Sequence, residues 1–143
     1  PGVLDDLGLG PALQSLADDF AQRTDVTCSV ETVVFRNRLD QEARIALYRI
    51  AQEALANALK HARATSVHIA LRLRSAEVVL SVKDDGVGFD PRAKIPEGHF
   101  GIQGMGERAS LLGGRLDLHS KPGHGSLVRA VVPLHSPASE VRH

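Results

Sequence analysis

We predict a two-layer α/β fold in which helices cover one face of a mixed, mostly antiparallel sheet. Three observations lead to this class. Segments with helical and strand periodicity follow one another in the order helix, strand, helix, two strands, helix, two strands. The predicted strands over 66–74 and 77–84 are joined by a link too short for a parallel crossover, so they must be antiparallel. The length of 143 residues suits one domain with one core.

The helices are predicted from apolar stripes and from their end signals. Gly10-Pro11 opens the first helix, because proline suits the first helical position. A long helix over about 40–62 has Asp40 as its N-cap. A third helix, over 102–112, ends at Gly113-Gly114, a natural stop signal. The predicted buried stripe of the long helix is Ile45, Tyr48, Ala51, Leu55 and Leu59.

The remaining strands are predicted over 26–34, 115–120 and 126–134, the last two joined by the turn Lys121-Pro122-Gly123. Cys28 alternates with neighbouring valines in the first of these strands. It is the only cysteine, which excludes an internal disulfide. We interpret Cys28 as a packed strand residue rather than a nucleophile.

The composition excludes several classes of function. Seventeen Lys and Arg residues balance 17 Asp and Glu residues, which argues against a nucleic-acid binder and against contact with anionic lipid. The sequence contains neither an apolar run of membrane-spanning length nor a signal-peptide pattern. We therefore expect a cytoplasmic domain over 11–134, preceded by a linker remnant over 1–10 and followed by a disordered tail over 135–143.

The stretch VVLSVKDDGVGFD raises a question of register. If the valine–leucine face of this strand is buried, alternation turns Asp84 toward the core, where a bare carboxylate is very costly. Gly86 and Gly88 follow at once and permit close backbone approach. We interpret this as a pocket floor at which Asp84 accepts a hydrogen bond from a ligand N–H, such as an adenine amino group. The alternative is a glycine-rich turn with exposed aspartates, which fits Asp85.

The long helix carries four polar side chains on one side, at spacings of four, three and four: Glu53, Asn57, Lys60 and His61. Oxygen ligands suit magnesium, and a lysine suits a phosphate. This set can therefore hold a magnesium ion and a phosphate group. The alternative is an ordinary solvated face of an amphipathic helix.

Two further glycine-rich stretches are candidate ligand sites. In HFGIQGMGER, glycines lead into a helix, whose free N–H groups attract phosphate. The stretch is neither a Rossmann nor a Walker A motif. Taken alone, His99 is more typical of a loop histidine than of a ligand-binding residue. The second stretch, Gly123-His124-Gly125-Ser126, is typical of a hairpin turn, although Ser126 could offer its hydroxyl to a ligand.

The order of these motifs resembles the GHKL ATPase superfamily: E-x-x-x-N on a helix, D-x-G-x-G after a strand, a glycine-rich entry to a helix, and G-x-G-S before a last strand. The segments YRIAQEALANALKHA, DDGVGFD and HFGIQGMGERASLLGG are similar to the ATP-binding domain of sensor histidine kinases that signal to NarL-type regulators, the NarX-like and DesK-like subfamily. The resemblance implies the Bergerat ATP-binding fold.

The resemblance also implies a role for each site residue. Asn57 would bind magnesium, Lys60 and His61 would contact phosphates, and Glu53 would be the catalytic acidic residue. Asp84 would accept from the adenine amino group. The other implied ATP-binding residues are Gly86, Gly88, His99, Gly101, Gly104, Met105 and Ser126, with a short ATP lid over about 90–100.

The implied activity is that of a protein-histidine kinase that uses ATP and Mg²⁺. None of the seven histidines lies in a His-Asp or His-Glu context, so the phosphoacceptor is expected on dimerisation helices outside this chain. The implied partners are those helices and a NarL-type response regulator, and the isolated domain is expected to be a monomer. The alternatives are an anti-sigma-factor serine kinase of the same superfamily and a non-catalytic nucleotide-binding module.

Overall fold

The structure is a computed structural model that describes residues 8–32, 39–88 and 101–134. Helices and strands follow one another in the predicted order. The elements are α2 (Leu9–Arg23), β1 (Thr27–Thr32), α3 (Gln41–Lys60), β2 (Ser66–Arg74), β3 (Glu77–Asp84), α4 (Gly101–Leu111), β4 (Arg115–Ser120) and β5 (Ser126–Pro133).

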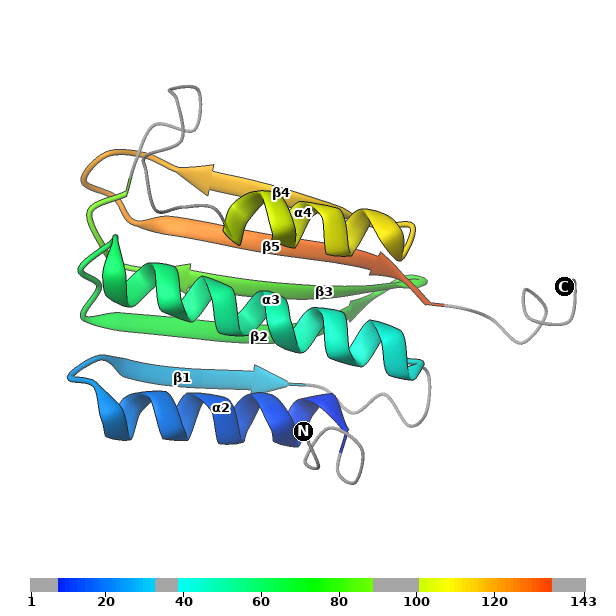
Figure 1. The fold of residues 1–143 in the computed structure, drawn as a ribbon, viewed down its shortest axis with the longest axis horizontal. Helices are drawn as coiled ribbons and strands as arrows, with labels where there is room; N and C mark the ends of the chain where they lie inside the picture. Colours follow the sequence, from blue (N-terminus) through cyan, green and yellow to red (C-terminus); the bar gives the residue numbers. More distant parts are fainter. Residues whose placement is uncertain (1–7, 33–38, 89–100, 135–143) are drawn as a thin grey trace, which may run out of the picture.

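The strands form one mixed sheet with the order β1-β2-β3-β5-β4 (Figure 1). β1 runs parallel to β2, and the other three neighbouring pairs are antiparallel. The predicted antiparallel pairing of β2 with β3 is confirmed, with Val67 opposite Asp84. On its other side β3 pairs with β5, which places Ser126 opposite Asp84. The last residue of the central strand therefore has a strand neighbour on each side.

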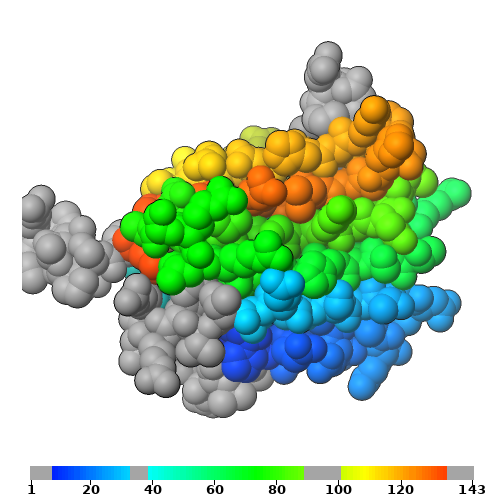
Figure 2. Space-filling view, turned by 180° about the vertical axis from the view of Figure 1, so that it is seen from behind, coloured from blue at the N-terminus to red at the C-terminus, as the bar shows by residue number. Residues whose placement is uncertain are grey.

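The three described helices lie on one face of this sheet, α3 in front of the central strands and α4 in front of β4 and β5 (Figure 1). Figure 2 shows the opposite face, where the strands themselves form most of the visible surface. The predicted two-layer fold is therefore confirmed. The core lies between the layers, and its largest fully buried side chains include Leu13, Leu47, Ile50, Leu71 and Leu80.

The helix ends follow the predicted signals closely. Asp40 caps α3 as predicted, because its side chain accepts a hydrogen bond from the backbone N–H of Ala43 at 2.9 Å. The chain leaves α4 at Gly113, whose φ of 78° belongs to the left-handed region that glycine tolerates. α2 begins at Leu9, earlier than predicted, because the side chain of Leu9 is itself buried in the core.

The predicted buried stripe of α3 is only partly right. Ala51 and Leu55 are buried, but Leu59 is 44% exposed. The buried residues of α3 are Ala43, Leu47, Ile50, Ala51, Ala54, Leu55 and Ala58. The predicted stripe missed two large, fully buried side chains, Leu47 and Ile50. It also missed three small alanines, which allow the helix to lie close to the sheet.

Cys28 is half-buried in β1 and packs against the core, in agreement with the interpretation as a strand residue. Burial raises the pKa of its thiol to about 11, and the nearby Asp18 carboxylate adds to this rise. The thiolate is therefore scarce at neutral pH. Among the described residues, none of the helices combines the length and apolar character needed to cross a membrane.

Candidate functional site

The last side chain of β3 lies on the helix side of the sheet. Val78, Leu80 and Val82 are buried in the core, and side chains alternate along a strand, so Asp84 shares their face as predicted. Its carboxyl group is half-buried and accepts a hydrogen bond from the backbone N–H of Gly86 at 2.8 Å. This bond fixes the orientation of the carboxylate at the strand end.

The surroundings of Asp84 shift its acidity. Burial raises the pKa of the Asp84 carboxyl, the backbone N–H groups of Gly86 and Ser126 partly oppose this rise, and the charge of Asp85 adds to it. Among the described residues, no cation forms an ion pair with Asp84. The carboxylate therefore keeps acceptor capacity that suits an N–H donor of a ligand.

A cavity of about 410 Å³ adjoins Asp84, within the usual size range of small-molecule sites. It lies between the carboxyl-terminal part of α3 and the helix-side face of β3, β4 and β5. Its lining brings together six residues that the sequence predicted: Asn57, Lys60, His61, Asp84, Gly88 and Ser126. These residues come from three separate parts of the chain, so the fold itself assembles the polar set.

The two glycines of the pocket floor are required mainly by contacts within the chain. A Cβ on Gly86 would collide with the backbone carbonyl of Ala62, just after α3. Gly88 has a φ of 66°, and a Cβ there would collide with the carbonyl of Lys121 in the β4–β5 hairpin. Gly88 lines the cavity but Gly86 does not. Both glycines let the loop after β3 fit between the end of α3 and the hairpin.

Of five other predicted site residues, the four that the structure describes lie outside the cavity lining. Glu53 and Gly101 lie outside its lining, but they adjoin each other, because a Cβ on Gly101 would meet the Glu53 side chain. Gly104 has open space around it. Met105 is 1% exposed and packs in the core, so its side chain is not at the cavity. His99 and the predicted lid over 90–100 lie outside the described residues.

Asp85 is exposed, as the sequence suggested, but its side chain also has a structural role. Its carboxylate accepts hydrogen bonds from the backbone N–H groups of Thr65 at 2.8 Å and Ser66 at 2.9 Å, and from the Thr65 hydroxyl. These bonds lower the pKa of Asp85 to about 2, the Thr65 hydroxyl contributing most. We call this set of bonds the Asp85 clamp. It ties the end of β3 to the start of β2.

Several lining residues were not predicted from the sequence. Arg63 follows α3, Val87 lies between the two floor glycines, and Ile102 and Leu118 come from α4 and β4. The apolar members, which also include Ala54, Val82 and Val128, give the cavity a partly apolar wall. The alternation of apolar and polar residues in β4 and β5 could have placed Leu118 and Val128 on the face toward the helices. No local pattern marks Arg63, because its position depends on how α3 ends.

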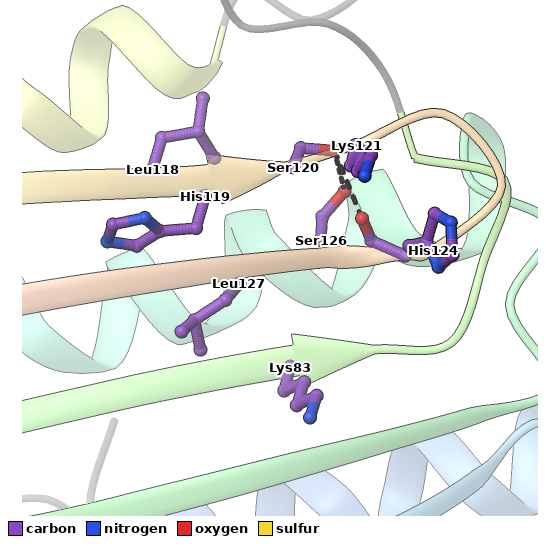
Figure 3. Close-up of a pocket in the computed structure, with 9 residues that line it drawn as sticks. Lys83, Leu118, His119, Ser120, Lys121, His124, Ser126 and Leu127 are labelled. Carbon is purple, nitrogen blue, oxygen red and sulfur yellow. Dashed lines mark hydrogen bonds between the residues drawn. The ribbon is translucent and has the colours of Figure 1, made fainter.

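A second, more open cavity of about 360 Å³ lies at the β4–β5 hairpin and shares Leu118 and Ser126 with the first. In Figure 3 the helices lie behind the strands, and Lys83 and His119 project from β3 and β4 on the side away from α3. Ser120 donates to the carbonyl of Gly125 at 3.1 Å and bonds the Ser126 hydroxyl at 2.9 Å (Figure 3). These bonds stabilise the hairpin, which lies between the two cavities.

The described residues contain no group of three or more His, Cys, Asp or Glu side chains that could hold a metal by themselves. The cavity nevertheless offers the amide of Asn57 near Lys60 and His61. Magnesium is commonly held by one or two protein oxygens together with phosphates of a substrate. The donor set therefore fits a magnesium ion that arrives with a nucleotide.

The chain was compared with known proteins. Residues 42–136 match the family described as histidine kinase-, DNA gyrase B- and HSP90-like ATPase. The chain is 37% identical over 132 residues to the signal transduction histidine-protein kinase/phosphatase DegS of Brevibacillus brevis, covering 92% of the chain and 34% of that protein. It is also 37% identical over 135 residues to the oxygen sensor histidine kinase NreB of Staphylococcus carnosus, covering 94% and 39%. The chain thus spans less than half the length of these relatives.

Two solved structures have the same fold. The blue-light activated histidine kinase of Erythrobacter litoralis EL346 matches 94% of the chain with a TM-score of 0.74 and 25% identity, over 43% of that structure. The ATP binding domain of PrrB from Mycobacterium tuberculosis matches 89% of the chain with a TM-score of 0.66 and 25% identity, over 94% of that structure. The second match covers nearly all of a separately solved domain.

Proposed function

Because the chain belongs to the family of histidine kinase-, DNA gyrase B- and HSP90-like ATPases, we propose that it is the ATP-binding catalytic domain of a two-component sensor histidine kinase. One observation carries this proposal. The cavity beside α3 brings a half-buried carboxylate together with an amide, a lysine and a histidine. A purine nucleotide needs both kinds of partner, because its base carries N–H donors and its phosphates carry negative charge.

At the base end, Asp84 accepts a hydrogen bond from the exocyclic amino group of adenine. The Gly86 N–H fixes the orientation of the carboxylate, so the carboxylate loses little conformational freedom when the base binds. The hydroxyl of Ser126 lies on the neighbouring strand, opposite Asp84, and offers a second polar contact. Gly88 lines the cavity with its backbone, and its missing side chain leaves room for the carbonyl of Lys121.

For the phosphates, Asn57 supplies a magnesium ligand, and Lys60 and His61 contact phosphate oxygens. The bound ion would neutralise charge on the phosphates during transfer. Gly104, around which the structure leaves open space, would let the first turn of α4 approach the phosphates with its backbone. The catalytic role of Glu53 stays a prediction, supported by its place on α3 one turn before Asn57 and beside Gly101.

The proposed reaction transfers the γ-phosphoryl group of ATP to a histidine on dimerisation helices of the full-length kinase, for relay to an aspartate of a NarL-type response regulator. The chain's own contribution is to bind the nucleotide, orient it and screen its charge. A cytoplasmic location and a monomeric isolated domain belong to the same proposal. Two relatives that are 37% identical to the chain are named as histidine kinases, and these names support the proposal.

The test combines the chain with a separately produced dimerisation segment of a relative, γ-labelled ATP and magnesium. We expect label on histidine, which is labile in acid and stable in base. Acid-stable label on serine would instead favour a serine kinase of the same superfamily. Calorimetric titration of the chain alone with Mg-ATP provides the first step, and absence of binding would reject both kinases.

A further inference from the structure

Arg63 has an unusual backbone conformation. Among the described residues, only Arg63 with a φ of 52° and Ser75 with a φ of 53° are non-glycine residues in the left-handed region. L residues with a side chain adopt this region at a cost, whereas glycine adopts it freely. Strain of this kind persists only where the surroundings impose it, and it is common at ligand sites.

The surroundings fix Arg63 from both sides. Before it, the carbonyl of Ala62 accepts a hydrogen bond from the Val87 N–H at 2.8 Å. After it, Thr65 and Ser66 donate to the Asp85 clamp. The backbone at position 63 is thus held between two contacts with the loop that carries the pocket floor, and it cannot relax without releasing one of them.

The Arg63 side chain is exposed and lines the cavity beside α3. Within the described part of the chain, it makes no ion pair or side-chain hydrogen bond with another residue. Arg63 comes three residues after Lys60, past the carboxyl end of α3. The residue before it, Ala62, contacts Gly86 and Val87 in the loop that follows Asp84, so Arg63 lies beside the loop next to the proposed base-binding carboxylate.

We propose that Arg63 is a nucleotide-contacting residue at the base end of the cavity, where its planar guanidinium covers the exposed face of the purine. This inference rests on the proposed function. Asp84 holds an edge of the base, and apolar side chains such as Leu118 and Ile102 line the cavity. One face of the purine is then left toward the cavity mouth, and a guanidinium stacks well on such a face.

The test uses three variants of the chain: Arg63→Gly, Arg63→Lys and, as a matched control, Ser75→Gly. Ser75→Gly removes the same backbone strain in the β2–β3 turn, outside the cavity lining. We expect Arg63→Gly to weaken ATP and ADP by the same factor, about five- to tenfold, the size of a cation–π contact. Its thermal midpoint should stay level or rise, as for Ser75→Gly, which should bind with wild-type affinity. Arg63→Lys should lose nearly as much affinity, because lysine keeps the positive charge but lacks the planar guanidinium group.

The outcomes separate the two proposals. If the wild-type chain fails to bind Mg-ATP, the proposed function is overturned and this inference with it. If the wild type binds and Arg63→Gly binds equally well, only the inference is overturned. A loss larger for ATP than for ADP and restored by Arg63→Lys would also overturn it, because Arg63 would then contact phosphate. If Arg63→Gly proves unstable, Arg63→Lys decides instead, because it keeps a side chain at the strained backbone position. Its affinities for ATP and ADP are then judged in the same way.

Discussion

Asp84 and Asp85 are neighbours in the chain with the same side-chain chemistry, but they occupy opposite environments. Asp84 is half-buried at the cavity, and burial raises the pKa of its carboxyl. Asp85 is exposed, and the hydrogen bonds of the Asp85 clamp lower the pKa of its carboxyl to about 2. Alternation at the strand end accounts for the difference, because one side chain turns toward the helices and the next does not.

The two shifts have opposite consequences for stability. The pKa of Asp84 is higher in the folded than in the unfolded chain, so its ionisation favours unfolding as the pH rises through the window between the two values. The pKa of Asp85 is lower in the folded chain, so its ionised form stabilises the fold above the unfolded value of about 3.9. A carboxylate held at a stability cost indicates a functional site, whereas one that stabilises indicates a structural contact.

The strongest test of this contrast is Asp84→Asn. We expect ATP affinity to fall by about 100-fold, since a charged acceptor at the base is replaced by an amide that also presents a donor. The free chain should be at least as stable as wild type at pH 7, because a partly buried charge is removed while the amide oxygen can still accept from Gly86. Calorimetric titration and thermal unfolding measure the two effects. An unchanged affinity would remove Asp84 from the site.

The contrast also shows how far the sequence could predict the site. The alternation of β3 was enough to turn Asp84 toward the helices, because a buried strand face leaves one choice of register. The clamp partners of Asp85 are Thr65, just before β2, and Ser66, its first residue, so only the tertiary pairing of β2 with β3 reveals them. Arg63 was missed for a similar reason, since its placement depends on contacts with the loop at Val87.

The fold was predicted more completely than the site, because strand and helix periods are local properties of the chain. The order of elements and the antiparallel pairing of β2 with β3 followed directly. The burial of Leu9 and the role of alanines in α3 did not, because they depend on how closely α2 and α3 approach the sheet. The packing of Met105 in the core was not predicted either, because it depends on how α4 lies against the sheet.

The close packing of the loop after Asp85 against the end of α3 is tested by Gly86→Ala. The added Cβ would collide with the backbone of Ala62, which cannot move without shifting the end of α3. We expect a loss of about 2 kcal/mol in the free energy of unfolding, typical of overpacking, together with weaker ATP binding. The matched control is Gly104→Ala, which meets no atom within 4 Å and should keep or slightly raise stability, because alanine favours a helix. Equal unfolding curves for Gly86→Ala and wild type would contradict the close approach.

The Asp85 clamp is tested by Asp85→Ala. We expect a loss of about 1 kcal/mol at pH 7, small because the carboxylate is exposed and its hydrogen bonds compete with water. The difference from wild type should shrink as the pH falls from about 4 toward about 2, where the clamp is protonated in the wild type as well. Chemical unfolding at several pH values measures this. The control is Asp19→Ala, which removes only a surface ion pair with Arg23; a pH-independent loss in Asp85→Ala would argue against the clamp.

The smallest effect is expected from Lys83→Ala, on the opposite side of β3. Lys83 precedes Asp84 by one residue, but it lines the open cavity with His119 (Figure 3) and not the cavity beside α3. At physiological salt, charges on the far side of the sheet are largely screened, so ATP affinity should change by less than about twofold. Titrations at two salt concentrations check this, since a long-range contribution of the lysine charge would grow at low salt. A loss above fivefold at physiological salt would mean that the ligand reaches round the hairpin at Ser126, and the two sides of β3 would then form one site.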